Sequence, residues 1–322
     1  MSIRSLTARA GSTPVFLLLL TLPAISIPLC DDGVAHARPI VALLTDFGLE
    51  NEAVGLCHAA ILRHDSEIEV LDLCHNVTAY DVPLAALMLR GSSLLPSGAA
   101  VVGVVDPGVG TARRAIAVRT GAGITYVGPD NGIFSWVLAD QGATEAVELD
   151  PSRINPDWSP GTFDGRDLFS PAAALIVKPG GTLATVGRPI DPASLQRLET
   201  PRARAFREPD GRMASLGGVV LREDRPYGNL WTNITRDELA DVGIALGGEI
   251  TVTFLAGADA ADAQPLQLSV PFVVTFGQVA KGKPLAYIGS AGTLSFAINL
   301  GSFRETYGLA EGSQVEIRRP AR

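Results

Sequence analysis

Apolar runs alternate with helical patterns along the first part of the chain. Short apolar and β-branched runs predict strands at 40–44, 68–73, 99–105, 115–119 and 125–127. Apolar residues at the spacing of one helix face predict helices at 52–63, 82–94, 133–140 and 168–177. This alternation predicts an α/β domain whose parallel or mixed sheet is covered by helices on both faces.

The pattern changes near residue 200. Pro, Arg and Glu are frequent at 189–212, which is typical of a connecting segment. Short alternating segments then predict strands at 214–222, 249–256, 267–276, 285–288, 293–299 and 314–318. They indicate a small all-β, barrel-like domain. We therefore expect an α/β domain at 38–200, a linker at 201–212 and a β-barrel-like domain at 213–322.

The first 37 residues have the features of a secretory leader. Arg4 and Arg9 precede an apolar stretch at 15–29, and AHA at 35–37 fits a cleavage site before Arg38. The apolar stretch contains a proline and is shorter than the ~20 residues of a spanning helix. We expect residues 1–37 to be a signal peptide and the mature protein to be exported, either to the periplasm or into the medium. An uncleaved membrane anchor is the alternative.

Charge and cysteine content restrict the partners. The chain has 34 Asp and Glu against 26 Lys and Arg, a formal net charge of −8, which disfavours nucleic acid and anionic membranes. Cys57 and Cys74 remain after the leader, and we expect free thiols, although export would permit a disulfide. The sequence contains no Cys-x-x-Cys pattern and no His/carboxylate cluster with metal-ligand spacing, so no metal is expected.

A carboxylate and a guanidinium stand close together in VVDPGVGTARR at 104–114. The apolar segment 99–105 leads into Asp106, Pro and Gly force a tight turn, and Arg113 follows seven residues after the carboxylate. Catalytic groups of open α/β sheets gather at the carboxyl ends of strands. The spacing predicts an acid beside a cation in a site. An Asp-Pro-Gly turn with a surface ion pair is the alternative.

Together with this loop, five further segments resemble the S-adenosyl-L-methionine (SAM) hydroxide adenosyltransferase family, which is related to the SAM-dependent fluorinase and chlorinase. They are LLTDFG at 43–48, DLCHNV at 72–77, GPDNG at 128–132, TFDGRD at 162–167 and DRPYGNLWTNI at 224–234. The resemblance implies an α/β domain followed by a barrel-like domain. It also implies hydrolysis of SAM to adenosine and methionine with no further cofactor, in a homotrimer with sites at subunit interfaces.

The resemblance assigns residues to the reacting water and the ribose. Asp106 would polarise a water that attacks ribose C5′, and Arg113 would keep that carboxylate ionised and stabilise developing hydroxide. Asp46 would bind the ribose hydroxyls, because one carboxylate can accept from two vicinal hydroxyls. A helix cap is the alternative role for Asp46. Tyr80 would flank the substrate, with a packing aromatic as its alternative.

Further substrate contacts are implied in the C-terminal domain. Asp224 would pair with the methionine ammonium group, and Asn229 would bind the adenine edge. The rings of Tyr227 and Trp231 would form walls of the site. A β-turn between strands is the alternative interpretation of this segment.

The chain departs from the family pattern at two positions. Asp164 stands where the family has a His; His titrates near neutral pH, whereas Asp normally stays charged. Phe163 and Gly165, its neighbours, would border the reacting carbon. Ser290 would bind the methionine carboxylate, but Ala291 replaces an Arg that often accompanies it, which removes a bidentate clamp.

These departures leave retained, weakened or lost hydrolysis open. A non-catalytic protein that binds adenosyl compounds is therefore an alternative function. A halide-using adenosyltransferase is a further alternative, which Asp106 disfavours because a fixed anion repels halide.

Overall fold

The computed structural model describes residues 38–199, 201–207, 213–255 and 264–318. The predicted signal peptide, 1–37, lies outside the described residues, and export of the mature protein stays a prediction. Among the described residues, no helix has both the length and the apolar character needed to cross a membrane.

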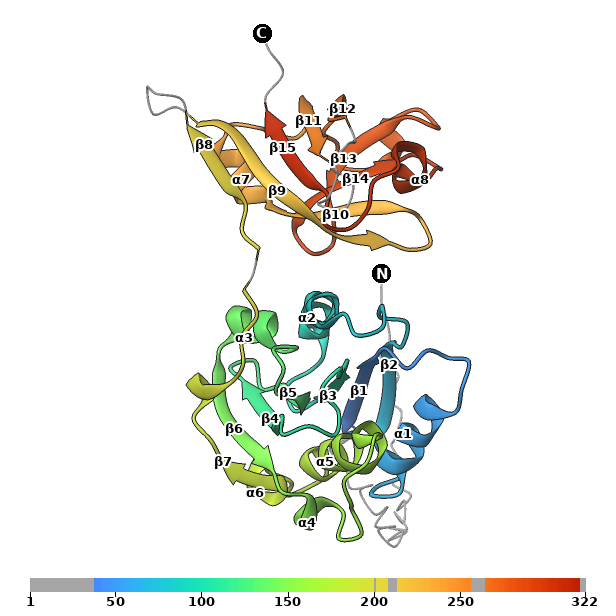
Figure 1. The fold of residues 1–322 in the computed structure, drawn as a ribbon, viewed down its shortest axis with the longest axis vertical. Coiled ribbons are helices and arrows are strands. Elements are labelled where there is room, and N and C mark those ends of the chain that lie inside the picture. Colours follow the sequence, from blue (N-terminus) through green and yellow to red (C-terminus); the bar gives the residue numbers. More distant parts are fainter. Residues whose placement is uncertain (1–37, 200, 208–212, 256–263, 319–322) are drawn as a thin grey trace, which may run out of the picture. The chain divides into compact units, whose positions relative to one another are not determined.

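The N-terminal domain is built on one mixed sheet (Figure 1). Its strands are β1 (Ile40–Thr45), β2 (Glu69–Cys74), β3 (Ala100–Val104), β4 (Ala115–Thr120), β5 (Thr125–Pro129), β6 (Ala143–Leu149) and β7 (Gly187–Pro189). They lie in the order β2-β1-β3-β5-β4-β6-β7. The pairs β1–β2, β1–β3 and β3–β5 are parallel, whereas β4, β6 and β7 pair antiparallel. The predicted α/β class with a mixed sheet is confirmed.

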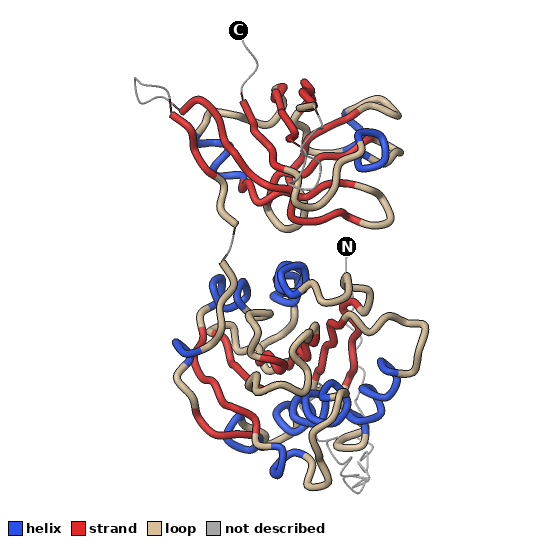
Figure 2. The backbone as a smooth tube through the Cα atoms, viewed as in Figure 1, coloured by secondary structure: helices blue, strands red, loops and turns tan. Residues whose placement is uncertain are grey.

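Helices cover both faces of this sheet, as Figure 2 shows. The main ones are α1 (Ala53–Leu62), α2 (Val82–Leu89), α3 (Ser135–Gln141) and α5 (Ser170–Val177); α4 (Pro151–Ile154) and α6 (Leu183–Val186) are short. Val41 and Leu43 of β1 join a core with α1 and α5, and Ala42 and Leu44 join a second core with α2 and α3. Successive strand residues point to opposite faces. A central parallel strand is therefore apolar throughout.

The helix predictions were partly wrong at their ends. The helix predicted at 82–94 ends at Leu89 as α2 and continues as the 3₁₀ turn η1 (Arg90–Leu94). The helix predicted at 168–177 is α5, preceded by a π-helical turn, η2 (Gly165–Phe169). Such turns are frequent at functional sites. Strand β6 was not predicted, because its exposed face carries polar residues.

The C-terminal domain is an eight-stranded sheet that nearly closes on itself. Its strands are β8 (Arg204–Arg207), β9 (Met213–Asp224), β10 (Asn229–Thr235), β11 (Glu249–Leu255), β12 (Leu266–Pro271), β13 (Pro284–Ile288), β14 (Thr293–Ile298) and β15 (Gln314–Arg318). The order is β12-β11-β15-β9-β10-β14-β13, and β8 pairs with β9. A bridge between Phe272 and Ala286 brings the two ends together. The barrel-like description is confirmed.

Details of this domain differ from the sequence predictions, and strand β10 was not predicted. Strand β8 lies inside the segment 201–212 that was predicted as a linker, and it pairs with β9. Two short helices, α7 (Arg236–Asp241) and α8 (Phe303–Tyr307), were not predicted. The first begins at a capping box, in which Thr235 and Glu238 each bond the other's backbone N–H.

Cys57 and Cys74 are free, as predicted. Burial raises the pKa of the Cys57 thiol from 9.0 to about 11. The unfolded state therefore loses this proton first, and stability falls as the pH rises between the two values. We expect this group to lower the free energy of unfolding by at most about 1.4 kcal/mol per pH unit in that window. Urea titrations should show this slope in wild type and in Cys74→Ala, and lose it in Cys57→Ala; an unchanged slope contradicts the assignment.

Candidate active site

The first candidate half-site lies at one edge of the N-terminal sheet. Asp46 directly follows β1, and Asp106 follows β3 after one intervening residue. These strands are parallel neighbours, with Thr45 opposite Val104, so their carboxyl ends meet. Asp164 arrives from a different part of the chain, immediately before η2. The sheet therefore gathers three carboxylates from distant segments at the edge where α/β proteins bind ligands.

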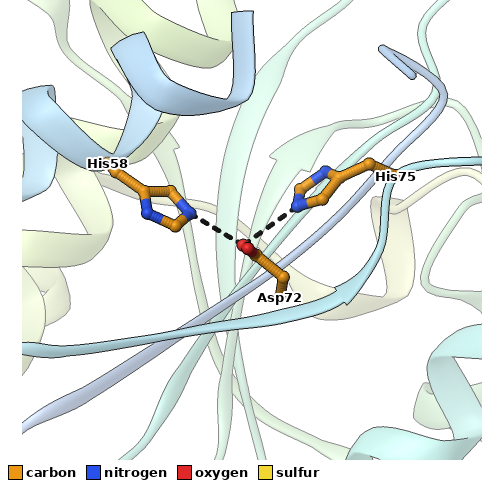
Figure 3. A group of neighbouring side chains, drawn as sticks. All are labelled: His58, Asp72 and His75. Carbon is orange, nitrogen blue, oxygen red and sulfur yellow. Dashed lines mark hydrogen bonds and ion pairs between the residues drawn. The ribbon is translucent and has the colours of Figure 1, made fainter. Parts of the chain in front are cut away.

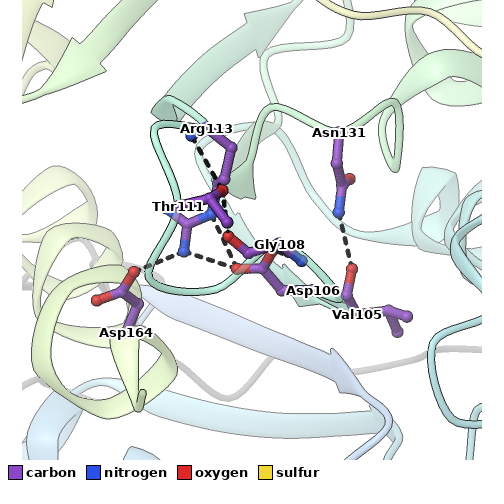
Figure 4. Close-up of polar contacts among 7 residues, drawn as sticks. All are labelled: Val105, Asp106, Gly108, Thr111, Arg113, Asn131 and Asp164. Atoms are coloured by element: carbon purple, nitrogen blue, oxygen red, sulfur yellow. Dashed lines mark hydrogen bonds and ion pairs between the residues drawn. The ribbon is translucent and has the colours of Figure 1, made fainter. Parts of the chain in front are cut away.

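Arg113 joins two of these carboxylates (Figure 4). Its Nε and Nη2 donate to Asp106 Oδ2 at 2.9 and 2.6 Å, and Nη2 also donates to Asp164 Oδ2 at 2.5 Å. The side chains are 13%, 5% and 9% exposed for Arg113, Asp106 and Asp164. A surface ion pair, the alternative interpretation of the 104–114 loop, is therefore wrong. Burial would lower the pKa of Arg113, but the two carboxylates raise it above its ordinary value.

The backbone of the loop fixes the other oxygen of Asp106. The Gly108 N–H donates to Asp106 Oδ1 at 3.2 Å, and the Thr111 hydroxyl donates to the Gly108 carbonyl at 2.6 Å. Gly110 has a φ of +77°, a conformation that favours glycine. Asp106 Oδ1 therefore accepts from the loop backbone, whereas Asp106 Oδ2 accepts from Arg113. The motif at 104–114 contains the residues that this geometry needs.

The GPDNG motif at 128–132 holds this loop in place through hydrogen bonds and an ion pair. Asn131 Nδ2 donates to the Val105 carbonyl at 2.9 Å, which anchors the end of the strand before Asp106. Asp130, whose side chain is 3% exposed, pairs with Arg114. The sequence analysis gave neither Asn131 nor the Asp130–Arg114 pair a role. The adjacent arginines 113 and 114 were the available signal, because Arg114 binds Asp130 while Arg113 binds the carboxylates of the cavity.

A small cavity of about 100 Å³ collects the predicted residues of this domain. Its lining is acidic and aromatic and consists of Asp46, Phe47, Tyr80, Val104, Asp106, Val109, Thr162, Phe163, Asp164 and Gly165. Arg113 stands behind the two carboxylates that it binds. The N-terminal residues singled out from the sequence therefore form one site.

Asp46 and Tyr80 are linked through the backbone. The Tyr80 N–H donates to Asp46 Oδ2 at 3.0 Å, and Tyr80 has a φ of +68°, a strained conformation for a residue with a side chain. Helix α1 has Glu52 as its N-cap residue, and Asn51 Oδ1 accepts from the Ala53 N–H, so the helix-cap alternative for Asp46 is wrong. Tyr80 is 73% exposed, which rules out the packing alternative. Both side chains are available to a ligand.

Gly165 lies where a side chain would not fit. A Cβ there would stand 2.9 Å from Cζ of Phe47, whose ring packs edge-on against Phe163 with centroids 5.6 Å apart. A larger residue at 165 would displace the aromatic pair that lines the cavity.

The second candidate half-site lies on the C-terminal domain, at the turn between β9 and β10. Asp224 ends β9 and Asn229 begins β10, and Asn229 Nδ2 donates to Asp224 Oδ2 at 3.0 Å. Tyr227 in the turn is 66% exposed. The turn alternative thus describes 224–228, while the residues that follow form a strand. A cavity of about 640 Å³ is lined here by Asp224, Pro226, Tyr227, Asn229, Phe276, Tyr287, Ile298, Asn299, Leu300, Gly301 and Ser302.

Trp231 and Ser290 do not line this cavity, although they were predicted beside its other residues. The guanidinium carbon of Arg222 lies 3.9 Å from the centroid of the Trp231 ring, a cation–π contact that occupies one face. Tyr287 was missed by the sequence analysis. Burial, and then the charge of Asp224, raise its pKa to about 12, so its hydroxyl stays neutral in the lining of this cavity.

Fold and site together define a class of two-domain proteins, with a carboxylate–guanidinium cluster on an α/β domain and an acidic, aromatic cavity on a barrel-like domain. The chain belongs to the SAM hydroxide adenosyltransferase family. The N-terminal domain of that family matches residues 41–187, and its C-terminal domain matches residues 218–316.

Several known proteins are similar over most of their length. A protein of Thermus thermophilus named (R)-S-adenosyl-L-methionine hydrolase is 38% identical over 87% of this chain and 99% of its own. A protein of Actinopolyspora mzabensis named fluorinase is 29% identical over 88% of this chain and 99% of its own. A solved structure of an uncharacterised conserved protein from Thermotoga maritima covers 87% of this chain and all of its own, with 30% identity and a TM-score of 0.77.

Proposed function

We propose that this protein is an enzyme that hydrolyses SAM to adenosine and L-methionine. Similarity to the hydrolase of Thermus thermophilus supports the reaction. The observation that carries it is the buried Asp106–Arg113–Asp164 cluster, which lies next to Asp46 in one cavity. That cavity combines acceptors for a water molecule with a carboxylate suited to ribose.

The reaction is a displacement at ribose C5′. The water oxygen forms a bond to C5′ while the C5′–sulfur bond breaks, and the bonding pair stays on sulfur. Because the sulfonium becomes a neutral thioether, the leaving group needs no proton. The water's proton passes to a carboxylate of the cluster and then to solvent. Holding water and C5′ in line supplies much of the rate.

The cluster residues divide this work. Arg113 donates to Asp106 and Asp164 and fixes their positions, and carboxylate oxygens accept hydrogen bonds from water and orient it. Asp46 has Oδ2 bonded to the Tyr80 N–H, which leaves further lone pairs for the two ribose hydroxyls. Gly165 and Phe163 border the space where C5′ would lie. Asp164, in place of the family's His, then acts as a second carboxylate acceptor rather than a neutral base.

The negative charge of the cavity also favours water over halide as the nucleophile. Two carboxylates and one guanidinium leave the cluster with one net negative charge, and Asp46 adds a second. An anionic cavity attracts the sulfonium cation and repels chloride or fluoride. This electrostatic argument favours hydrolysis over the halide-using alternative.

We extend the proposal to the C-terminal half-site. Asp224 binds the methionine ammonium group, Asn229 contacts adenine, and Tyr227 packs against the base. Trp231 and Ser290 are proposed to complete the methionine and adenine contacts in the assembled enzyme. Assembly is proposed as a homotrimer with sites at subunit interfaces, which light scattering on the purified protein tests; a monomer at micromolar concentration would contradict it.

Export of the mature protein is also proposed. The charged start, apolar stretch and AHA sequence of residues 1–37 support cleavage before Arg38. Mass spectrometry of the protein recovered from cell fractions tests this. A cytoplasmic protein that retains residues 1–37 would contradict it.

The function itself is tested by incubating the purified protein with SAM in ¹⁸O-labelled water. Chromatography and mass spectrometry should find methionine and adenosine carrying one ¹⁸O at the 5′ position. Asp106→Asn should abolish release, while Asp157→Asn, which alters an exposed carboxylate outside the cavity, should not. SAM that raises the melting temperature but stays intact would instead establish the binding-protein alternative.

Asp224→Asn tests the methionine contact. The variant loses a charged partner for the substrate ammonium, an interaction whose hydrogen bond is worth about 1.5–3 kcal/mol. We expect KM for SAM to rise about 10- to 100-fold, with a much smaller change in kcat, because the ammonium lies far from the reacting bond. Steady-state kinetics measure this split. Equal losses in kcat and kcat/KM would instead place Asp224 in the chemical step.

A further inference from the structure

A second cluster of polar side chains lies on the N-terminal domain, apart from the cavity just described (Figure 3). It consists of His58 on α1, Asp72 on β2 and His75 directly after β2. Nε2 of His58 lies 2.7 Å from Asp72 Oδ1, and Nε2 of His75 lies 2.9 Å from the same oxygen. The three potential ligand atoms all lie within 4.8 Å of one another.

One buried atom of this cluster lies close to Asp72 but does not make a well-directed hydrogen bond. The His75 side chain is 2% exposed, and its Nδ1 lies 2.8 Å from the Thr45 hydroxyl. Its Nε2 is buried and, despite its closeness to Asp72, makes no well-directed hydrogen bond. A buried nitrogen left in this state is costly, and an ion bound beside it is one explanation.

We propose that His58, Asp72 and His75 form a binding site for a divalent transition-metal ion of the zinc type. Two imidazole nitrogens and one carboxylate oxygen are a ligand set that Zn²⁺ prefers, with water in the fourth position. The side chains of His58 and Asp72 are 29% and 44% exposed, so an ion can enter from their side and water can complete its coordination.

The spacing fits after a small adjustment. Zinc–nitrogen bonds of about 2.0–2.1 Å place two tetrahedral ligands roughly 3.3 Å apart. The present separations of 2.7 and 2.9 Å must therefore widen slightly. The two exposed side chains can turn to do this, while His75 stays fixed. The Thr45 hydroxyl can accept the Nδ1–H of His75, the outer contact that metal-bound histidines usually have.

The site connects to the loop that carries Asp46. The Thr45 hydroxyl, which contacts His75, also accepts the Phe47 N–H at 3.2 Å, and Gly48 N–H donates to the His75 carbonyl at 2.7 Å. A bound ion would hold the His75 ring and, through it, this loop. The role is structural, because none of the three ligands lines the cavity of Asp106 and Asp164. The inference therefore stands whether or not the protein hydrolyses SAM.

The test is calorimetric titration of the chelator-treated protein with Zn²⁺, together with the visible spectrum of added Co²⁺. We expect one ion per chain, a tetrahedral Co²⁺ spectrum and a melting temperature that rises with Zn²⁺. His58→Gln removes an exposed ligand and should weaken Zn²⁺ binding by more than the about 10- to 100-fold typical of losing an outer-shell partner.

His64→Gln is the matched control, because His64 is an exposed histidine that follows the end of α1, the helix that carries His58. It should bind Zn²⁺ as wild type does. Absence of Zn²⁺ binding to the wild-type protein would overturn the proposal. So would binding that His58→Gln and His64→Gln reduce equally, since the ion would then sit on surface histidines in general.

Discussion

Arg113→Met is expected to lower the free energy of unfolding by about 3–5 kcal/mol, the usual cost of leaving a buried charge without its partner. Asp106 and Asp164 are 5% and 9% exposed, and both bond to the same Nη2 atom of Arg113. Methionine keeps the volume and removes the charge, so two buried carboxylates then face each other. Adenosine release should stop as well, because the variant loses the group that orders both water acceptors.

The pH dependence of this loss of unfolding free energy distinguishes an effect of charge from an effect of packing. Two adjacent carboxylates without Arg113 repel, which raises the pKa of the pair in the folded variant above its unfolded value. The folded variant then binds more protons than the unfolded one, so its stability recovers as the pH falls from 7 towards 4. The difference in unfolding free energy between wild type and variant should shrink over that range. Urea denaturation at stepped pH measures it.

Arg90→Met is the matched control for this experiment. Arg90 pairs with Asp140, but the two side chains are 36% and 43% exposed. Exposed pairs contribute about 1 kcal/mol or less. If Arg113→Met were no more destabilising than Arg90→Met, the buried cluster would not carry the energy assigned to it.

The N-terminal sheet was predictable because its central strands are buried on both faces. Residues 41–44 are all apolar, and each face of β1 reaches a different helical layer. Strand β10 carried no such signal. Its Thr232 and Asn233 are buried, and they are satisfied by the Leu294 carbonyl and by Val219 N–H. A strand with buried polar residues can be explained only when their hydrogen-bond partners on other strands are known.

Like the fold, the candidate site could be predicted only in part from the sequence. Asp106 and Arg113 occur in one short loop, so their pairing followed from spacing. Asp164 could be assigned to the site only through the family motif, because 51 residues separate it from Arg113, whose guanidinium it binds. Nothing in the sequence joined His58 to His75, since their approach depends on how α1 packs beside β2. Local geometry could be predicted from the chain, whereas contacts between elements required the fold.

Asp164→His is expected to raise the rate of adenosine release at least about 10-fold near pH 8, a fraction of what a positioned general base contributes. The imidazole would accept the water's proton at the position where the family carries His. The neighbouring Arg113 cation lowers the pKa of this new imidazole below its ordinary value of about 6.5, so the neutral, basic form dominates at pH 7 and above. The rate should therefore rise with pH through that pKa and then level.

Asp164→Asn distinguishes a base from a mere loss of charge. Asparagine has nearly the shape of the native side chain but cannot take a proton, and Arg113 keeps Asp106 as its partner in both variants. A gain with His alone means that the native carboxylate is a weak substitute for a base. An equal gain with Asn would mean that the second negative charge restrains the reaction, and an unchanged or lower rate with His would mean that Asp164 already serves the water as this enzyme requires.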